Sequence, residues 1–173
     1  GVLTIFGFET EKFNNIISEK VYKSNKNINI KLSTVKFKLD IKEISLYLET
    51  ENPSINYQDI IIPAKNIKLY IDFFSLIKSD AQIKRINLVS KEFEIQELKK
   101  ISKILKPSNL KSFLRDKVQN GKINTEIEIY LNDKNFLDNF IARGSVTNFS
   151  VKIYKNIVLE KTSFTFTADK TDV

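Results

Sequence analysis

The chain lacks cysteine, histidine, methionine and tryptophan, and it contains only four glycines and three prolines. Without cysteine there is no disulfide, no thiolate nucleophile and no cysteine metal site. Without histidine the commonest general base near neutral pH is missing too. The scarcity of glycine and proline leaves few tight turns of the Asn-Gly or Pro-Gly kind. These absences remove the commonest catalytic chemistries.

Motifs for other kinds of catalysis are also missing. The sequence has no Gly-x-Ser-x-Gly elbow, no glycine-rich phosphate loop and no Asp-x-Asp-x-Asp-Gly calcium loop. The carboxylate pairs Glu92/Glu94 and Glu126/Glu128 alternate with other residues in strand-like segments, where a solvated polar face is the common role. We therefore predict that the chain is not an enzyme and uses no metal and no cofactor.

The composition is that of a folded globular chain. Its 173 residues are 42% hydrophobic and 28% charged, which suits one domain with an apolar core. The sequence starts at Gly1 without methionine and stops just after the strand-like run Phe164–Ala168. These two features predict that it is a fragment of a longer chain.

The N-terminal segment has two interpretations. Residues 1–8 are apolar but far shorter than the roughly 20 residues that cross a bilayer. They are either a buried first strand or the end of a membrane anchor that begins upstream. After them, Thr10 can cap a short amphipathic helix over Thr10–Lys23, with Phe13, Ile16 and Val21 on one side. Residues 9–173 are then the body of the domain.

From Ile28 onward the apolar residues recur at every second position. Such one-sided alternation is typical of antiparallel strands. Its phase slips by one residue between Leu32 and Val35, and again before Ile44, so a turn or β-bulge must absorb each slip. The sequence therefore predicts a mainly β fold with short helices (α+β), built on a long curved antiparallel sheet that forms a gutter or half-barrel.

The alternation is interrupted by a helical insert at 97–118. Leu98 and Ile101 begin one helix, Pro107 ends it, and a second helix is predicted to run through Val118 to a stop at Gly121. The insert holds seven basic and two acidic residues, most of the net charge of +7. Its lysines can contact anionic headgroups or nucleic acid, or simply be solvated. The membrane-surface candidates are Lys99, Lys100, Lys103 and Lys106.

The order of elements resembles a known family. After the N-terminal helix come strands, then the segments 51–55, 63–69, 73–77 and 83–88, which read ENPSI, PAKNIKL, FFSLI and IKRINL. Residues 140–149, FIARGSVTNF, resemble later strands of the same family. The pattern is similar to the N-terminal region of AsmA-like proteins, the family of bridge-like lipid-transport proteins that includes YhdP and TamB. It covers about residues 10 to 168 and contains no invariant chemical motif; the helical insert departs from it.

The resemblance implies a membrane-anchored protein of the Gram-negative envelope. Its N-terminus would be anchored in the inner membrane and its body would lie in the periplasm. An apolar β-sheet groove would carry phospholipid between the inner and outer membranes. The implied partners are phospholipid acyl chains, the inner membrane and other envelope proteins, with no nucleic acid.

Physical reasoning leads to a similar groove. Each exposed Leu, Ile or Phe forfeits roughly 1.5–3 kcal/mol, and three short helices cannot cover so many apolar strand positions. Either the sheet folds on itself or acyl chains cover the remainder. The groove candidates are Ile30, Leu32, Phe37, Leu39, Leu46, Leu48, Leu69, Ile71, Leu88, Ile127, Ile129, Val146 and Phe166.

Two alternatives stay open. The first is a structural or interaction β-sandwich with a closed core and no lipid ligand. The second is a nucleic-acid binder that uses the lysines of the insert, although the scarcity of arginine disfavours bidentate phosphate recognition.

Overall fold

The computed structural model describes residues 2–4, 18–19, 22, 26–33, 35–40, 42–43, 45–72, 82–103, 109–134 and 136–170. Most of these residues lie in antiparallel strands, and two short helices accompany them, which confirms the predicted fold class. Ser18, Glu19 and Tyr22 are helical, but most of the helix predicted over Thr10–Lys23 falls outside the described residues. Of residues 1–8, only the strand Val2–Thr4 is described.

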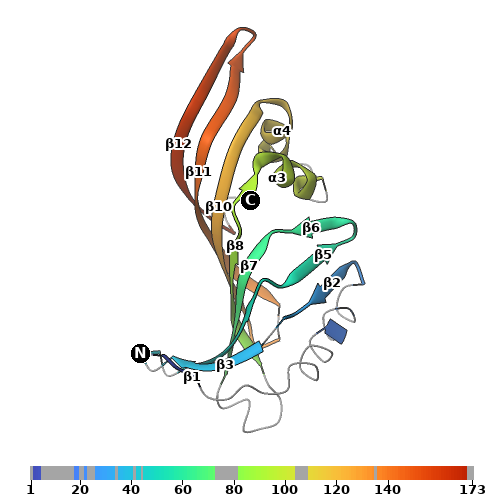
Figure 1. Cartoon of the computed structure of the whole chain (residues 1–173), viewed down its shortest axis with the longest axis vertical. Coiled ribbons are helices and arrows are strands. Elements are labelled where there is room, and N and C mark those ends of the chain that lie inside the picture. Colours follow the sequence, from blue (N-terminus) through green and yellow to red (C-terminus); the bar gives the residue numbers. More distant parts are fainter. Residues whose placement is uncertain are drawn as a thin grey trace.

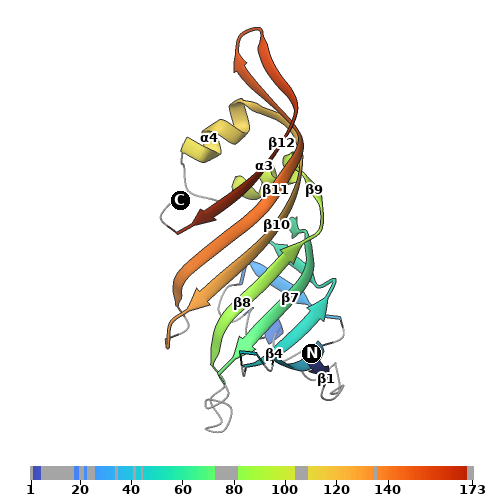
Figure 2. The same ribbon diagram turned by 90° about the vertical axis from the view of Figure 1, so that its left-hand side faces the viewer.

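A large, strongly twisted sheet forms the long axis of the molecule (Figures 1 and 2). Eight strands follow the order β1-β3-β4-β7-β8-β10-β11-β12, and β9 pairs separately with β10. The described strands do not close into a barrel. Their bounds are β1 (Val2–Thr4), β3 (Val35–Asp40), β4 (Ser45–Glu51), β7 (Ala64–Ile71), β8 (Ile83–Ser90), β9 (Phe93–Glu94), β10 (Val118–Leu131), β11 (Leu137–Tyr154) and β12 (Ile157–Asp169).

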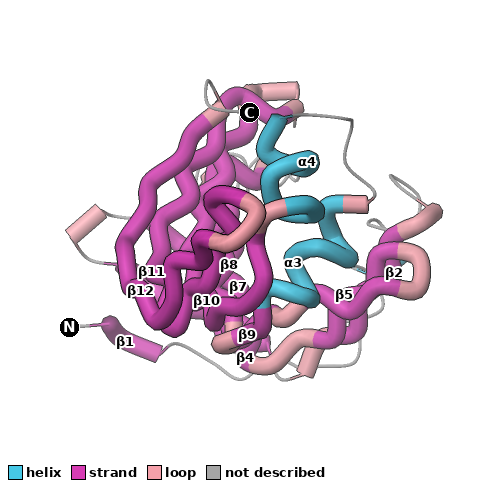
Figure 3. The backbone as a smooth tube through the Cα atoms, turned by 90° about the horizontal axis from the view of Figure 1, so that it is seen from above, coloured by secondary structure: helices cyan, strands magenta, loops and turns pink. Residues whose placement is uncertain are grey.

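A second, smaller sheet lies over one face of the first. It contains β2 (Ile28–Lys31), β5 (Ser54–Tyr57) and β6 (Ile60–Ile62) in the order β2-β5-β6. Asn52, with a φ of 47°, turns the chain out of β4 toward β5, and its N–H donates to the carbonyl of Lys65 at 2.7 Å. Viewed from above, the large sheet stands on one side, and the small sheet and both helices stand on the other (Figure 3).

The strand register separates an apolar face from a polar face. Residues paired directly across antiparallel strands point to the same face. One such row crosses six strands and is entirely apolar: Phe37, Leu48, Leu69, Ile86, Ile129 and Phe140. The adjacent row points the other way and is polar or amphipathic: Lys38, Tyr47, Tyr70, Arg85, Tyr130 and Asn139. We call the apolar side, which the small sheet and the helices cover, the inner face.

Both predicted phase slips have a structural explanation. Between Leu32 and Val35 the chain leaves the small sheet and enters the large one, so the two alternating segments belong to different sheets. Before β4 the chain makes a hairpin turn through Lys42 and Glu43. The carboxylate of Asp40 accepts the N–H groups of both residues at 2.9 and 3.2 Å. A change of sheet and a turn therefore keep the apolar residues on the inner face.

Two helices cover the inner face at the upper end of the sheet. They are α3 (Ile95–Ser102) and α4 (Asn109–Asp116). The prediction that the second helix continues through Val118 is wrong. The N–H of Lys117 closes the last turn on the carbonyl of Phe113 at 2.9 Å, and β10 begins at Val118. Gly121 is not a helix stop but a buried residue of β10, where a β-carbon would lie 3.3 Å from Val146 Cγ1.

Candidate functional site: an apolar groove between the two sheets

The inner face is covered in two different ways. At the upper end, helices α3 and α4 pack on β10 and β11 and form a core of Ile95, Leu114, Val118, Ile123, Val146 and Val151. In the middle, the small sheet contributes Ile55 to a cluster with Ala64 and Ile67 of β7. A third cluster joins Val35, Leu48 and Ile71 at the lower strands. We call the first the helix-covered core.

An apolar groove of about 440 Å³ lies between the small sheet and the large one. This volume is within the roughly 300–1,000 Å³ range of small-molecule sites. Twelve of its fourteen lining residues are Ile, Leu or Val. The lining consists of Ile28, Ile30, Leu32, Val35, Leu48, Glu49, Thr50, Ile55, Ile67, Leu69, Ile83, Ile86, Leu88 and Ile129.

The strand pairing explains why the lining is so uniform. The large sheet supplies one wall from β3, β4, β7, β8 and β10, with Leu69 paired to Ile86 and Ile86 paired to Ile129. The small sheet supplies the other wall through Ile30 and its partner Ile55. Since successive residues in a strand alternate between faces, the charged side chains of these strands point away from the groove. Glu49, the one charged residue of the lining, pairs its carboxylate with Lys38 of the opposite face. The site therefore offers contact with hydrocarbon and almost no hydrogen bonding.

The structure brings together about half of the predicted groove residues. Six of the thirteen line the groove: Ile30, Leu32, Leu48, Leu69, Leu88 and Ile129. Phe37 and Ile71 belong to the lower cluster beside it. By register, Leu39, Leu46 and Ile127 share the inner face but do not line the groove. Val146 and Phe166 lie in the helix-covered core instead, where they pack beneath the helices.

Eight other lining residues were not among the predicted ones: the polar Glu49 and Thr50, and the aliphatic Ile28, Val35, Ile55, Ile67, Ile83 and Ile86. Four of the aliphatic ones, Ile28, Val35, Ile67 and Ile86, are part of the alternating pattern, so the signal was present. Ile55 follows the Asn52-Pro53 turn and lies in a strand of only four residues. A strand this short carries too few alternations to be recognised.

An ion pair on the opposite face fixes the strands that form the groove wall. The Lys38 ammonium bridges to the Glu49 carboxylate, which also accepts a hydrogen bond from the Asn66 amide at 2.9 Å. Burial opposes ionisation of Glu49, but the bonds from Lys38 and Asn66 prevail and hold its pKa below the ordinary value. The hydrogen bond to Glu49 raises the pKa of Lys38. Strands β3, β4 and β7 are thereby joined behind the groove.

A second polar group joins β7, β8 and β10 on the same outer face. The Arg85 guanidinium lies 3.9 Å from the centre of the Tyr70 ring and pairs with Glu43 at 2.9 Å. Asn87 donates its amide to Glu126 at 2.6 Å and to Glu128 at 2.8 Å. Burial raises the pKa of the Tyr70 hydroxyl. Both carboxylates therefore have structural partners on the outer face; Glu126 is exposed, as predicted for a solvated face, whereas Glu128 is largely buried.

The basic helices form a cleft of their own at the upper end. Lys100 pairs with Glu97 at 3.2 Å, and the half-buried Lys99 donates to the carbonyl of Val118. Lys103 is exposed, and Lys106 lies outside the described residues. A pocket of about 290 Å³ between α3 and α4 is lined by Gln96, Lys99, Lys100, Ser102, Lys103, Lys111 and Arg115. Three of the four predicted membrane-surface lysines therefore share one surface, and Lys111 and Arg115 from α4 join them.

Among the residues that the structure describes, no cluster of three or more acidic side chains is placed to hold a metal ion. In the same part of the chain, no helix is both long enough and apolar enough to cross a bilayer.

Comparison with known proteins identifies no relative. No protein-family model, no curated protein and no solved structure matches the chain. The resemblance to AsmA-like proteins stays a prediction, since none of these comparisons bears on it.

Proposed function

We propose that this chain is a non-enzymatic segment of a membrane-anchored envelope protein and that it carries phospholipid by holding acyl chains in the groove between its two sheets. The proposal extends to an inner-membrane anchor and a periplasmic body. The observation that supports it best is the groove itself, in which twelve aliphatic residues surround about 440 Å³ of space.

The energetics favour an apolar occupant. Water in the groove would find few polar partners, whereas each methylene moved out of water gains about 0.8 kcal/mol. An acyl chain needs no directional contact, which suits a wall of Ile, Leu and Val side chains. Selectivity for one lipid over another would come from the headgroup outside the groove. The mechanism is passive, with hydrocarbon inside and the headgroup in water.

The lysines of the helices fit the same proposal. Lys100 and Lys103 are exposed on the surface that Lys111 and Arg115 share. Each lysine near an anionic membrane surface is worth about 1 kcal/mol. In this proposal the helices attract anionic headgroups while the groove takes the tails. The resemblance to AsmA-like proteins implies the same kind of cargo.

A charge placed in the groove tests the proposal. Ile129→Lys places an ammonium group in the lining. An acyl chain that enters the groove would have to displace the water that hydrates this charge, which is unfavourable. The matched control is Ile61→Lys, because Ile61 lies in β6 of the small sheet and is 70% exposed, outside the lining. We expect phospholipid to co-purify with wild type and Ile61→Lys and to be depleted at least tenfold in folded Ile129→Lys, as measured by mass spectrometry of extracted lipids.

The competing candidate is a structural or interaction β-domain. It is favoured by the packing of the small sheet on the large one, because Ile55, Ala64 and Ile67 already form a buried cluster there. It predicts that no variant changes the lipid content, since no lipid binds. Undiminished phospholipid in folded Ile129→Lys, or none in the wild type, would contradict our proposal and favour this candidate.

A further inference from the structure

The hairpin between β11 and β12 extends beyond the rest of the large sheet. It lies at the opposite end of the long axis from β1 (Figures 1 and 2). The last pairing of β10 with β11 joins Val118 to Val151, and the N–H of Lys152 still donates to the carbonyl of Lys117 at 2.8 Å. From Ile153 onward β11 pairs only with β12. All ten residues 152–161 are exposed. A two-stranded ribbon without a third strand is only marginally stable on its own. The residues of this extension therefore indicate what it contacts.

That sequence is unexpectedly apolar. Five large apolar or aromatic residues of the tip are between 39% and 67% exposed: Ile153, Tyr154, Ile157, Val158 and Leu159. Monomeric soluble proteins rarely gather exposed apolar residues in this way, and such patches usually mark contact with a partner or a membrane. We call residues 152–161 the hairpin tip.

The apolar residues occupy both faces of the ribbon. Ile157 and Leu159 project to one face because Leu159 pairs with the buried Val151, and Val158 projects to the opposite face. A protein partner docking on a flat surface would cover one face only. A medium that surrounds the ribbon covers both, and the interfacial layer of a lipid bilayer is such a medium.

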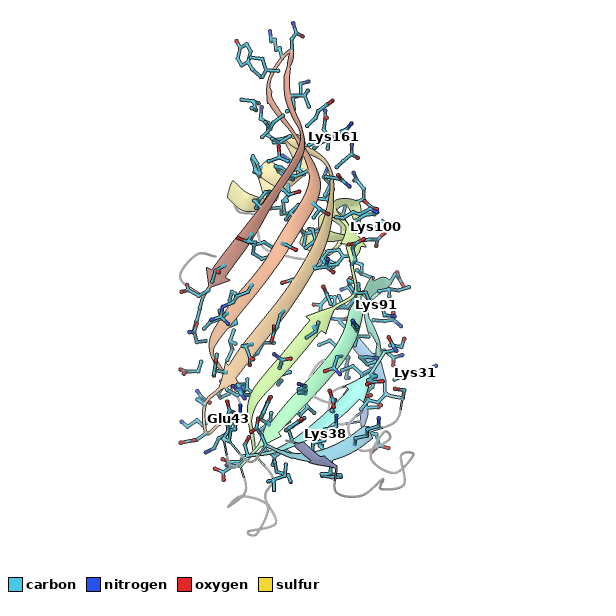
Figure 4. All side chains as sticks on the ribbon, turned by 60° about the vertical axis from the view of Figure 1, so that its left-hand side comes forward. Lys31, Lys38, Glu43, Lys91, Lys100 and Lys161 are labelled. Atoms are coloured by element: carbon cyan, nitrogen blue, oxygen red, sulfur yellow. The ribbon has the colours of Figure 1, made fainter. Side chains whose placement is uncertain are left out.

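The charges of the tip complement an anionic surface. It carries Lys152, Lys155 and Lys161 against a single carboxylate, Glu160, which gives a net charge of +2. In the described part of the chain none of these four residues forms an ion pair within 4.0 Å. Tyr154 adds a ring of the amphipathic kind enriched at membrane–water interfaces. Lys161 lies at the base of the hairpin, above Lys100 of α3 (Figure 4).

Two bulges set the hairpin apart from the sheet. Asn148 and Lys161 both have positive φ values, 50° and 52°, and both lie at register shifts between β11 and β12. Bulges increase local twist and change the direction of a ribbon. A lysine in the left-handed backbone conformation is uncommon, so the bulge at Lys161 is a defined feature of the hairpin. It turns the tip relative to the strands below.

We propose that the hairpin tip is a membrane-docking element that inserts its apolar residues into the interfacial layer of an anionic bilayer. This inference is independent of the proposed acyl-chain groove. The groove lies between the two sheets, whereas the tip stands at the far end of the large sheet (Figure 1). The tip would allow the chain to attach by the end opposite β1.

Vesicle co-sedimentation of the full 173-residue chain tests the proposal. We compare vesicles of phosphatidylcholine alone with vesicles that also contain phosphatidylglycerol. The tip variant is Tyr154→Ser/Ile157→Ser, and its matched control is Ile61→Ser, which removes an equally exposed apolar side chain from the small sheet. We expect wild type and control to bind phosphatidylglycerol vesicles, and the tip variant to bind at least tenfold more weakly. Circular dichroism verifies that the variants fold.

Charge variants separate the tip from the basic helices. Lys152→Gln/Lys155→Gln should weaken binding to phosphatidylglycerol vesicles by roughly fivefold per lysine and should leave binding to neutral vesicles unchanged. Lys100→Gln/Lys103→Gln tests the helix surface. If Lys100→Gln/Lys103→Gln weakens vesicle binding and neither tip variant does, the proposal is overturned.

Two further results would also overturn the proposal. One is failure of the wild type to bind phosphatidylglycerol vesicles. The other is a wild-type dimer that Tyr154→Ser/Ile157→Ser converts to a monomer with no change in vesicle binding, since the tip would then be a contact between copies. Retained vesicle binding by Ile129→Lys is expected, because that variant alters only the groove.

Discussion

The two ends of the inner face differ in how the same alternating pattern is covered. At the upper end, α3 and α4 seal β10 and β11 into a core where Val118 is 2% exposed and Ile123 is 4% exposed. In the middle, the small sheet packs on the large one but leaves the groove unfilled between them. Ile129, on the same strand β10, is only half-buried there. Alternation therefore determines which side chains face inward, and the covering element determines whether they are sealed.

The comparison is sharpest for two isoleucines of β10 that share a face. Ile123→Ala removes a side chain from the helix-covered core and should lower the free energy of unfolding by about 2–5 kcal/mol, because a cavity remains. Ile129→Ala enlarges an existing groove and should cost only about 1–1.5 kcal/mol. Urea unfolding of both variants measures the difference. Equal losses would contradict the distinction between a sealed core and an open groove.

The next largest effect concerns the close approach of β10, β11 and β12 around Gly144. A β-carbon on Gly144 would lie 2.2 Å from the carbonyl oxygen of Asn124 and 2.8 Å from the Phe166 ring. Gly144→Ala should therefore destabilise the protein by about 2–3 kcal/mol through overpacking. Gly121→Ala is the control, since its nearest contact is a methyl group of Val146 at 3.3 Å. If thermal melts give the two variants the same stability, the tight register is not a determinant of this core.

The ion pair behind the groove gives a smaller and pH-dependent effect. Lys38→Met leaves the Glu49 carboxylate without its cation and should cost about 1–2 kcal/mol at pH 7, a value reduced for the partial exposure of Lys38. Lys36→Met, on the same strand, is the control.

The pH dependence follows from the two pKa shifts. Glu49 has a lowered pKa, so its contribution is present above the ordinary value of about 4.3 and disappears as the pH falls through the folded value. Lys38 has a raised pKa, so its contribution is present below about 10.4 and disappears as the pH rises through the folded value. The difference between wild type and Lys38→Met should be largest between about pH 5 and pH 10. A difference that is constant from pH 3 to pH 7, measured by denaturant titration, would rule out this ion pair as its source.

The smallest effect belongs to the surface of the helices. Lys100 and Glu97 form an exposed i,i+3 pair at 3.2 Å. Lys100→Gln should change the free energy of unfolding by less than about 0.5 kcal/mol, because exposed pairs contribute little. Urea unfolding at low and high salt provides the measurement. A loss above about 1 kcal/mol would mean that the lysines of α3 hold the helix-covered core together.

The sequence predicted the sheet better than the groove. Regular alternation along segments such as 123–131 and 35–41 identified strands and their inward residues, since strand geometry has a period of two. It could not show that Ile28–Lys31 belongs to a separate sheet, because pairing with Ser54–Tyr57 is a long-range property. The run Ile60–Ile62 has no alternation to reveal it. The groove depends on the placement of that second sheet, so its full lining could not be predicted.

The end of the helical insert shows a different limit. Val118 fits the helical spacing of Leu110 and Leu114, and Gly121 is an ordinary helix-stop residue, so local pattern favoured a longer helix. In the structure Val118 begins β10 instead, because it pairs with Val151 and is buried in the helix-covered core. Tertiary packing overrode local propensity at this position.

The most direct test of the central claim uses the absence of cysteine from the chain. A single cysteine at Leu88→Cys reports on the groove, and one at Ile61→Cys reports on the exposed surface of the small sheet. Each thiol is reacted with a water-soluble maleimide before and after loading with phospholipid from mixed micelles. An occupied groove predicts that lipid slows the reaction of Leu88→Cys at least tenfold and leaves Ile61→Cys unchanged. Equal rates with and without lipid at Leu88→Cys would contradict the account.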